Sequence, residues 1–383
     1  MIDSIVRHPI LVGSFRSPDR VPDVRKLRLA GGGMTAQSRA IDRIVRICAS
    51  DVPDDRSLRV AILNEIRSVI AFDAFVWLLT DPETEVGSSP LADVPCLPEL
   101  PRLIMLKYLT PINRWTRVKG AVARLHESTG GRLERSLVWK SLLSRYGVTD
   151  VATTVFRNRQ GCWGFLDLWR VNAPEPFTAS ESALLASIAK RVTEALQRSQ
   201  ADTFKLRSPT GPVSGPVVLV LSPELEVRAQ TSETDEYLRL LIPPDYERQP
   251  IPAAAYNVGA QLLALEAGVD QHPPWARVHL SDGVWLTLRA SRLGVPERTG
   301  NPDIAVTIER SSPRQRLDLF SRACSLSARE AELLGHLILG ADTHLAAQSM
   351  FVSANTVQDH LKSIFAKTAT SSRRTLMARA VGQ

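Results

Sequence analysis

Residues 326–380 read LSAREAELLGHLILGADTHLAAQSMFVSANTVQDHLKSIFAKTATSSRRTLMARA, and this stretch decides the architecture of the C-terminal part of the chain. Ser327 and Glu330 have the spacing of a capping box, in which each side chain satisfies a backbone amide at a helix start. Apolar residues then recur along one helical face at Leu333, Leu334, Leu337 and Ile338. Gly340 ends this first helix, because glycine accepts the left-handed conformation at little steric cost.

Two shorter helical segments follow the glycine. Asp342 or Thr343 can cap the first of them, and its residues Leu345, Ala346 and Met350 are expected to face inward. Phe351-Val352 turns the chain. Ser353 then caps the next helix.

The helix that begins after Ser353 has two different faces. Its apolar residues Val357, Leu361, Ile364 and Phe365 share one side and are expected to pack inward. The opposite side carries Gln358, Asp359, Lys362 and Ala366, which are mostly able to form hydrogen bonds. Two short helices joined by a tight turn, with such a face on the second, suit insertion of a helix about 10 Å wide into the major groove of duplex DNA.

This stretch resembles the LuxR-type (FixJ-type) helix-turn-helix. The matching positions are Leu326-Ser327-x-Arg329-Glu330-x-Glu332, Gly340, Ala347, Phe351-Val352-Ser353-x-x-Thr356-Val357-x-x-His360, Ile364, Lys367 and Arg373. The resemblance covers about the last sixth of the chain. It departs from the family pattern at Ala346, at Ala369-Thr370 and at Asp359, which adds negative charge beside the expected groove.

The resemblance implies a set of DNA-binding residues and a homodimer. Gln358, Asp359 and Lys362 would face base edges, where glutamine suits adenine, lysine suits guanine and aspartate suits the cytosine amino group. The residues expected near phosphates are Ser353, Thr356, Lys367, Arg373 and Arg374. In this family the helix around Leu376–Ala380 commonly pairs with its symmetry mate, which motivates a homodimer on double-stranded DNA.

Residues 36–200 have the pattern of an α+β domain. Two helical stretches begin at residues 41 and 58, and a buried strand follows at 74–79. Strands at 151–156 and 162–169 are predicted to form a hairpin, and Thr178 and Glu181 open another helix. The hairpin GCWGFLDLWR and the helix after it resemble a GAF sensor domain, which implies a ligand cavity beside the sheet. No residue marks the ligand.

The rest of the chain divides into three further segments. Residues 1–35 are expected to be a disordered basic arm, or an extension ahead of a true start at Met34. Residues 201–216, rich in Pro, Gly and Ser, are a predicted linker. Residues 217–312 resemble a PAS domain in their order of strands and helices, and 313–383 form the LuxR-type domain after a charged connector near Arg314–Arg322. The fold class expected is multidomain, with two α+β sensor-like domains before an all-α, four-helix domain.

Composition sets limits on location and partners. The 383 residues are 44% hydrophobic with a formal net charge of +7, which suits a polyanion but also fits an arginine-rich genome. The four cysteines are far apart and indicate buried free thiols rather than a metal site. With no apolar run of about 18 residues, we expect a cytoplasmic protein that does not contact a membrane.

The leading functional prediction is a sequence-specific transcription regulator whose sensor modules adjust DNA affinity. The chain contains no GxSxG, Walker loop, HExxH or kinase motif, so an enzyme is disfavoured and no cofactor or metal is predicted. A receiver domain is also disfavoured, because the N-terminal half lacks regular βα alternation. The main alternative is that the C-terminal domain contacts another protein, such as RNA polymerase. Whether the sensor modules bind a small molecule or serve as structural spacers is left open.

Overall fold

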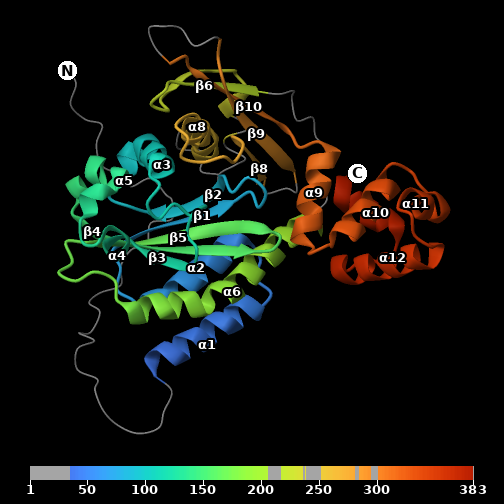
Figure 1. Ribbon diagram of the computed structural model, residues 1–383, viewed down its shortest axis with the longest axis horizontal. Coiled ribbons are helices and arrows are strands. Elements are labelled where there is room, and N and C mark those ends of the chain that lie inside the picture. Colours follow the sequence, from blue (N-terminus) through green and yellow to red (C-terminus); the bar gives the residue numbers. More distant parts are fainter. Residues whose placement is uncertain are drawn as a thin grey trace.

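The computed structural model describes residues 35–205, 217–235, 238, 252–280, 284–294 and 301–382. In these ranges two units, each built on a five-stranded antiparallel sheet, precede a helical unit at the C-terminal end (Figure 1). The predicted N-terminal arm up to Met34, linker residues 206–216 and residues 281–283 lie outside the described residues. None of the described helices is both long and apolar enough to cross a lipid bilayer.

The first sheet unit holds most of the helices of the N-terminal half. Its helices are α1 (Ala36–Ala49), α2 (Asp55–Arg67), α3 (Leu100–Leu109), α4 (Leu125–Thr129), α5 (Leu137–Ser141) and α6 (Ala179–Asp202). Its strands are β1 (Ala74–Thr80), β2 (Gly87–Asp93), β3 (Val122–Arg124), β4 (Val148–Asn158) and β5 (Gly161–Val171). Single-turn 3₁₀ helices lie at Leu97–Glu99, Leu133–Arg135, Leu143–Tyr146 and Thr203–Lys205.

Local capping explains where the long helices of this unit begin. The side chain of Thr35 accepts the Ser38 amide at the start of α1, and Asp54 accepts the Ser57 amide at the start of α2. Thr178 and Glu181 form the predicted capping box of α6. The predicted strand and hairpin are confirmed as β1, β4 and β5.

The first sheet has the strand order β2-β1-β5-β4-β3 and is covered on both faces. Trp77 of β1 packs in the core formed with α1, α2 and α6, whereas its neighbour Leu78 packs in a second core on the opposite face. Successive side chains of a strand point to opposite faces, so a strand buried on both sides needs a continuous apolar run. Residues 74–79 of β1 form such an apolar run, with the sequence AFVWLL.

The second sheet unit repeats the strand order of the first. It consists of β6 (Val217–Leu221), β7 (Val227–Gln230), α8 (Ala253–Glu266), β8 (Trp275–His279), β9 (Trp285–Arg292) and β10 (Ile304–Arg310). The strands follow the order β7-β6-β10-β9-β8, so in both sheets the first strand lies between the second and the fifth.

Helix α8 lies between the two sheets (Figure 1). Nearly all its residues up to Leu262 are buried, because it packs on α3 and β2 of the first unit and on β9 of the second. A buried ion pair adds to this contact: Nη2 of Arg114 donates to Oδ2 of Asp270 at 2.6 Å and to Oε1 of Gln261 at 2.7 Å. Burial opposes ionisation of Asp270, but bonds from His272 and Arg114 outweigh it and hold its pKa below the usual range.

The helical unit comprises α9 (Pro313–Ala323), α10 (Ala328–Ile338), α11 (Thr343–Ser349), α12 (Ala354–Thr368) and α13 (Arg373–Val381). The segment expected as a charged connector is therefore a helix, capped by Ser312 and Gln315. It buries Leu319 and Phe320 in a core that continues from the α6 side of the first sheet into α10, α12 and α13. The helical unit is thus packed against the sheet units through α9.

Candidate nucleic-acid interface

Helix α10 forms the base on which the other C-terminal helices pack. The Ser327 amide donates to Oε2 of Glu330 at 2.6 Å, and the Glu330 amide donates to Ser327 Oγ at 3.3 Å, which confirms the predicted capping box. Leu333, Leu334 and Leu337 are buried. Gly340, with a φ of 88°, follows the helix end as expected.

Helix α11 is capped by Asp342 rather than Thr343. Oδ1 of Asp342 accepts the amides of His344 at 2.9 Å and Leu345 at 2.8 Å, and these backbone bonds lower its pKa. The buried residues of this short helix are Ala346 and Ala347, with Met350 at its C-cap. The expectation that Leu345 faces inward was wrong, because its side chain is about half exposed. One residue along a helix is a rotation of about 100°, so the face that buries the two alanines turns Leu345 outward.

Helix α12 presents the polar face that its sequence pattern predicts. Ser353 Oγ accepts the Thr356 amide at 3.1 Å and starts the helix. Val357, Leu361 and Ile364 are buried against the unit, while the opposite side is exposed along Gln358, Asp359, Lys362 and Ala366. Nζ of Lys362 lies 3.2 Å from Oδ1 of Asp359, with 76% and 74% of the two side chains exposed. In Figure 1, α12 runs along the edge of the helical group.

A buried carboxylate fixes the inner side of α12. Glu330 accepts Lys367 Nζ at 2.6 and 2.9 Å and Ser363 Oγ at 2.6 Å, in addition to the Ser327 amide. Burial raises the pKa of Glu330, but these hydrogen bonds outweigh it and bring the pKa down to about 2. The ammonium of Lys367, expected near phosphates, is therefore held by a carboxylate of α10. A phosphate contact through Lys367 stays a prediction.

The two arginines at the start of α13 differ in their surroundings. Nη2 of Arg373 donates to Thr343 Oγ1 at 2.5 Å and so joins α13 to the start of α11. Arg374 is exposed. Of the residues expected to touch DNA, Thr356 and Arg373 are half-buried, and the exposed ones are Ser353, Gln358, Asp359, Lys362, Lys367 and Arg374.

Helix α13 is also anchored within the chain. Leu376 and Ala380 are fully buried, and α13 packs on α9 and α10. Nη1 of Arg379 donates to the carbonyls of Thr368 and Ala369 at the end of α12. The departure from the family pattern at Ala369 has a structural counterpart, because this residue adopts the left-handed conformation with a φ of 48°.

Sequence reasoning missed the partners that hold α12 in place. Glu330 was identified as a cap, but its bonds to Ser363 and Lys367 were not foreseen, and neither was the Thr343 contact of Arg373. The only local signal was an acidic residue inside a capping box followed, more than thirty residues later, by a lysine on the next long helix.

Comparison with protein families agrees with the geometry of the C-terminal helices. Residues 324–380 match the family model described as bacterial regulatory proteins, luxR family. No curated protein matches the chain. Among solved structures the chain is similar to SdiA of Escherichia coli, with 12% sequence identity, a TM-score of 0.33, and coverage of 90% of this chain and 97% of SdiA. With its capped α10, its tight α11–α12 turn and its family match, the segment 324–380 is a helix-turn-helix domain of the LuxR family.

Proposed function

We propose that this protein is a transcription regulator that binds duplex DNA by placing α12 in the major groove. The observation that carries the proposal is the two-sided character of α12. Its inner side is anchored by Val357, Leu361 and the Glu330–Lys367 pair, while Gln358 and Lys362 project from the other side. A groove about 12 Å wide admits a helix whose outer side chains are uncovered.

The side chains of α12 have distinct proposed roles. Gln358 and Lys362 read base edges, since glutamine pairs with adenine and lysine with guanine. Asp359 accepts a cytosine amino group and orients Lys362, which lies 3.2 Å away. Ser353, Thr356 and Arg374 contact phosphates and set the position of the helix without reading sequence.

We further propose that the protein acts as a homodimer on a palindromic site. Two copies of α12, placed about 34–36 Å apart, would then reach successive major grooves on one side of the duplex. Mass photometry of the full chain on a selected duplex tests this: two chains per duplex are expected, and a saturating ratio of one chain per duplex contradicts the dimer.

The two sheet units are proposed to be sensor modules, GAF-like for the first and PAS-like for the second. Their support is a shared layout: both sheets place the first strand between the second and the fifth, with helical chain between the second and third strands. The chemistry of any ligand is left unassigned.

The decisive test of the function uses the full chain and duplexes that the protein itself selects from a random pool. Binding of a labelled selected duplex is measured by fluorescence anisotropy at increasing salt. Phosphate contact releases counterions, so affinity should fall steeply and linearly in a log–log plot. Failure to bind any duplex at low salt removes the proposal.

A single substitution tests the role of α12. Lys362→Ala should weaken binding to the selected duplex by about 1–3 kcal/mol and relax the preference at one base position. Lys190→Ala, which removes an exposed lysine from α6 in the first sheet unit, is the matched control and should leave affinity unchanged. An equal loss on all duplexes would reassign Lys362 to the DNA backbone.

A second candidate function, contact with a protein such as RNA polymerase, is favoured by one observation. The helical unit exposes large apolar side chains, with Phe351 95% and Leu339 86% exposed. Phe351→Ser should then abolish activated transcription in a reconstituted assay while leaving duplex affinity intact. Unchanged transcription would remove this candidate.

A further inference from the structure

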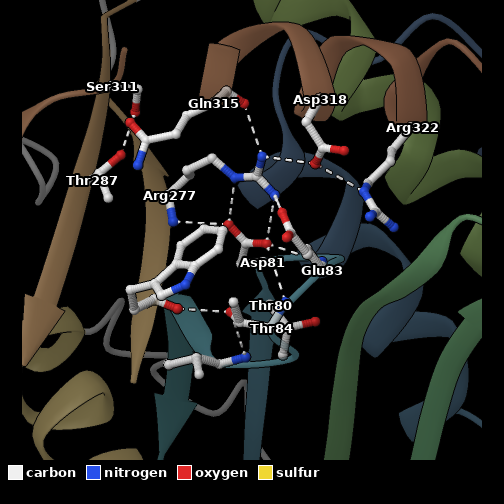
Figure 2. A network of polar contacts seen from close by, with 12 residues as sticks. Thr80, Asp81, Glu83, Thr84, Arg277, Thr287, Ser311, Gln315, Asp318 and Arg322 are labelled. Atoms are coloured by element: carbon white, nitrogen blue, oxygen red, sulfur yellow. Dashed lines mark hydrogen bonds and ion pairs between the residues drawn. The ribbon is translucent and has the colours of Figure 1, made fainter. Parts of the chain in front are cut away.

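A buried arginine connects the three units of the chain. Arg277 of β8 is 1% exposed, and its guanidinium lies between the β1–β2 turn of the first sheet and helix α9 (Figure 2). Toward the first sheet unit, Nε donates to Asp81 Oδ2 at 2.7 Å, while Nη2 donates to Asp81 Oδ1 at 2.8 Å and to Glu83 Oε2 at 3.1 Å. Toward α9, Nη1 donates to the Gln315 carbonyl at 2.8 Å and to Asp318 Oδ2 at 2.9 Å.

These contacts use every N–H of the guanidinium, which has five. The backbone amide of Arg277 also donates to Asp81 Oδ2 at 2.9 Å, so Asp81 binds β8 through both backbone and side chain. Burial opposes the charge of Arg277, but the carboxylates of Asp81 and Asp318 outweigh it and raise its pKa above the usual value. A lone buried cation would be costly, so the charge is tolerated because both neighbouring units supply anions.

An aromatic cluster joins the same three units at a second point. The ring of Phe204, just after α6, stacks on Trp285 of β9 with centroids 5.6 Å apart. The same ring meets Phe320 of α9 edge-on at 5.3 Å. Phe204, Trp285 and Phe320 therefore come from the first sheet unit, the second sheet unit and α9 respectively.

Helix α9 is held along its length by further bonds to the first sheet unit. Asp318 Oδ2 also accepts Nε of Arg322 at 2.9 Å, and Nη1 of Arg322 donates to the Gln160 carbonyl at the β4–β5 turn at 3.0 Å. Gln197 of α6 donates to the Arg322 carbonyl at 2.8 Å. A displacement between the two sheets must therefore break the bonds of Arg277 to Asp81 and Glu83, and α9 can then keep its bonds to only one of the two sheet units.

We propose that Arg277 is a positioning residue that holds the helix-turn-helix domain in one orientation relative to both sheet units, and that α9 carries any rearrangement between the sheets to α12. This orientation is controlled at an ionic junction, which is formed by Asp81, Glu83, Arg277 and Asp318. The Arg114–Asp270 pair joins the two sheet units directly, so it keeps them together when the ionic junction opens. The inference that this orientation regulates DNA binding rests on the proposed function.

The test measures the distance between β7 of the second sheet unit and α12 in the full chain without DNA. Spectroscopic labels are introduced as unnatural amino acids at the exposed positions Arg228 and Ala366. The native chain should give one narrow distance distribution, and Arg277→Met should broaden it at least twofold. Arg292→Met is the matched control, because Arg292 of β9 pairs at 2.6 Å with Glu266 of α8 inside the second sheet unit. Its distribution should stay narrow.

The outcome that overturns the proposal is an Arg277→Met distribution as narrow, and centred at the same distance, as the native one. Should that variant fail to fold, Asp318→Asn decides, because this carboxylate is 40% exposed and its loss leaves no buried cavity. Broadening in Asp318→Asn supports the proposal and an unchanged distribution overturns it. Because no DNA is present, failure of duplex binding would remove the proposed function without affecting this result.

Discussion

Glu330→Gln offers the sharpest test of how α12 is held. The pKa of Glu330 is lowered from the ordinary 4.5 to about 2. The folded domain therefore stabilises the charged form of this carboxylate by about 3 kcal/mol relative to the unfolded chain. Its main partner, Lys367, is partly exposed, and solvent screening reduces the share that stabilises folding. Glutamine keeps one acceptor for the Ser327 amide but brings an amide donor toward Ser363 or Lys367. We expect the free energy that protects α12 from local opening to fall by about 1–2 kcal/mol.

Hydrogen exchange of the α12 amides in the full chain, followed by mass spectrometry, measures this change. The matched control is Glu332→Gln on the same helix. Among the residues that the structure describes, Glu332 pairs with the exposed Arg329 alone, so this variant should change the free energy that protects α12 by less than about 0.5 kcal/mol. Because the folded-state pKa is depressed, the stabilisation is complete above pH 4.5 and is lost as the pH falls toward 2. The difference between native chain and variant should therefore shrink in that range. Equal effects of the two variants at neutral pH would refute the reasoning. So would a difference between the native chain and Glu330→Gln that stays the same from pH 4.5 down to pH 2.

Two further predictions concern the backbone and the thiols. Ala369→Gly should raise the free energy that protects the last turn of α12 from hydrogen exchange by up to about 1 kcal/mol, because alanine is strained at a φ of 48° and glycine is not. Ala366→Gly, inside the helix, should lower that free energy by a similar amount. A change of the same sign in both variants would contradict this account. Burial raises the pKa of Cys48 and Cys162 to about 11 and that of Cys96 and Cys324 to about 12, so alkylation by iodoacetamide at pH 8 should be slow until denaturant is added. Cys324 is only partly buried, so rapid native labelling of Cys48, Cys96 or Cys162, located by mass spectrometry, would contradict the burial.

Features set by neighbouring residues were predictable from the sequence. The caps Ser327, Asp342 and Ser353 and the stop at Gly340 all depend on contacts within one helical turn. The exposed face of α12 was predictable for the same reason, since helical periodicity separates its apolar and polar residues. Strands and hairpins were predictable too, but not the order in which they pair. β1 lies beside β5, about ninety residues later, and no local pattern encodes that pairing.

The wrong expectation for Leu345 and the unforeseen partner of Lys367 both arose where tertiary packing overrides a single-residue preference. Leucine is more apolar than alanine, so Leu345 was expected inside, yet close approach of α11 to α12 favours the small Ala346 and Ala347 at the contact. A lysine near a helix end suits phosphate, but Lys367 lies beside a carboxylate that is 37 positions away in sequence. Both outcomes depend on which helix lies opposite, and that is fixed only when the chain folds.

The same reasoning explains why the boundary expected at residue 312 gives little information about how the units are joined. A boundary is inferred from a change of pattern along the chain, whereas attachment depends on side chains such as Asp318 and Phe320, whose partners Arg277 and Phe204 are 41 and 116 positions away. Residues 314–322 were expected to be a charged connector because their charges were counted without their partners. In the structure Arg277 pairs with Asp318, so this charge attaches α9 to the second sheet unit. Under the proposed function, regulation requires no ligand contact near α12, because a movement of one sheet against the other would reach the helix-turn-helix domain through α9.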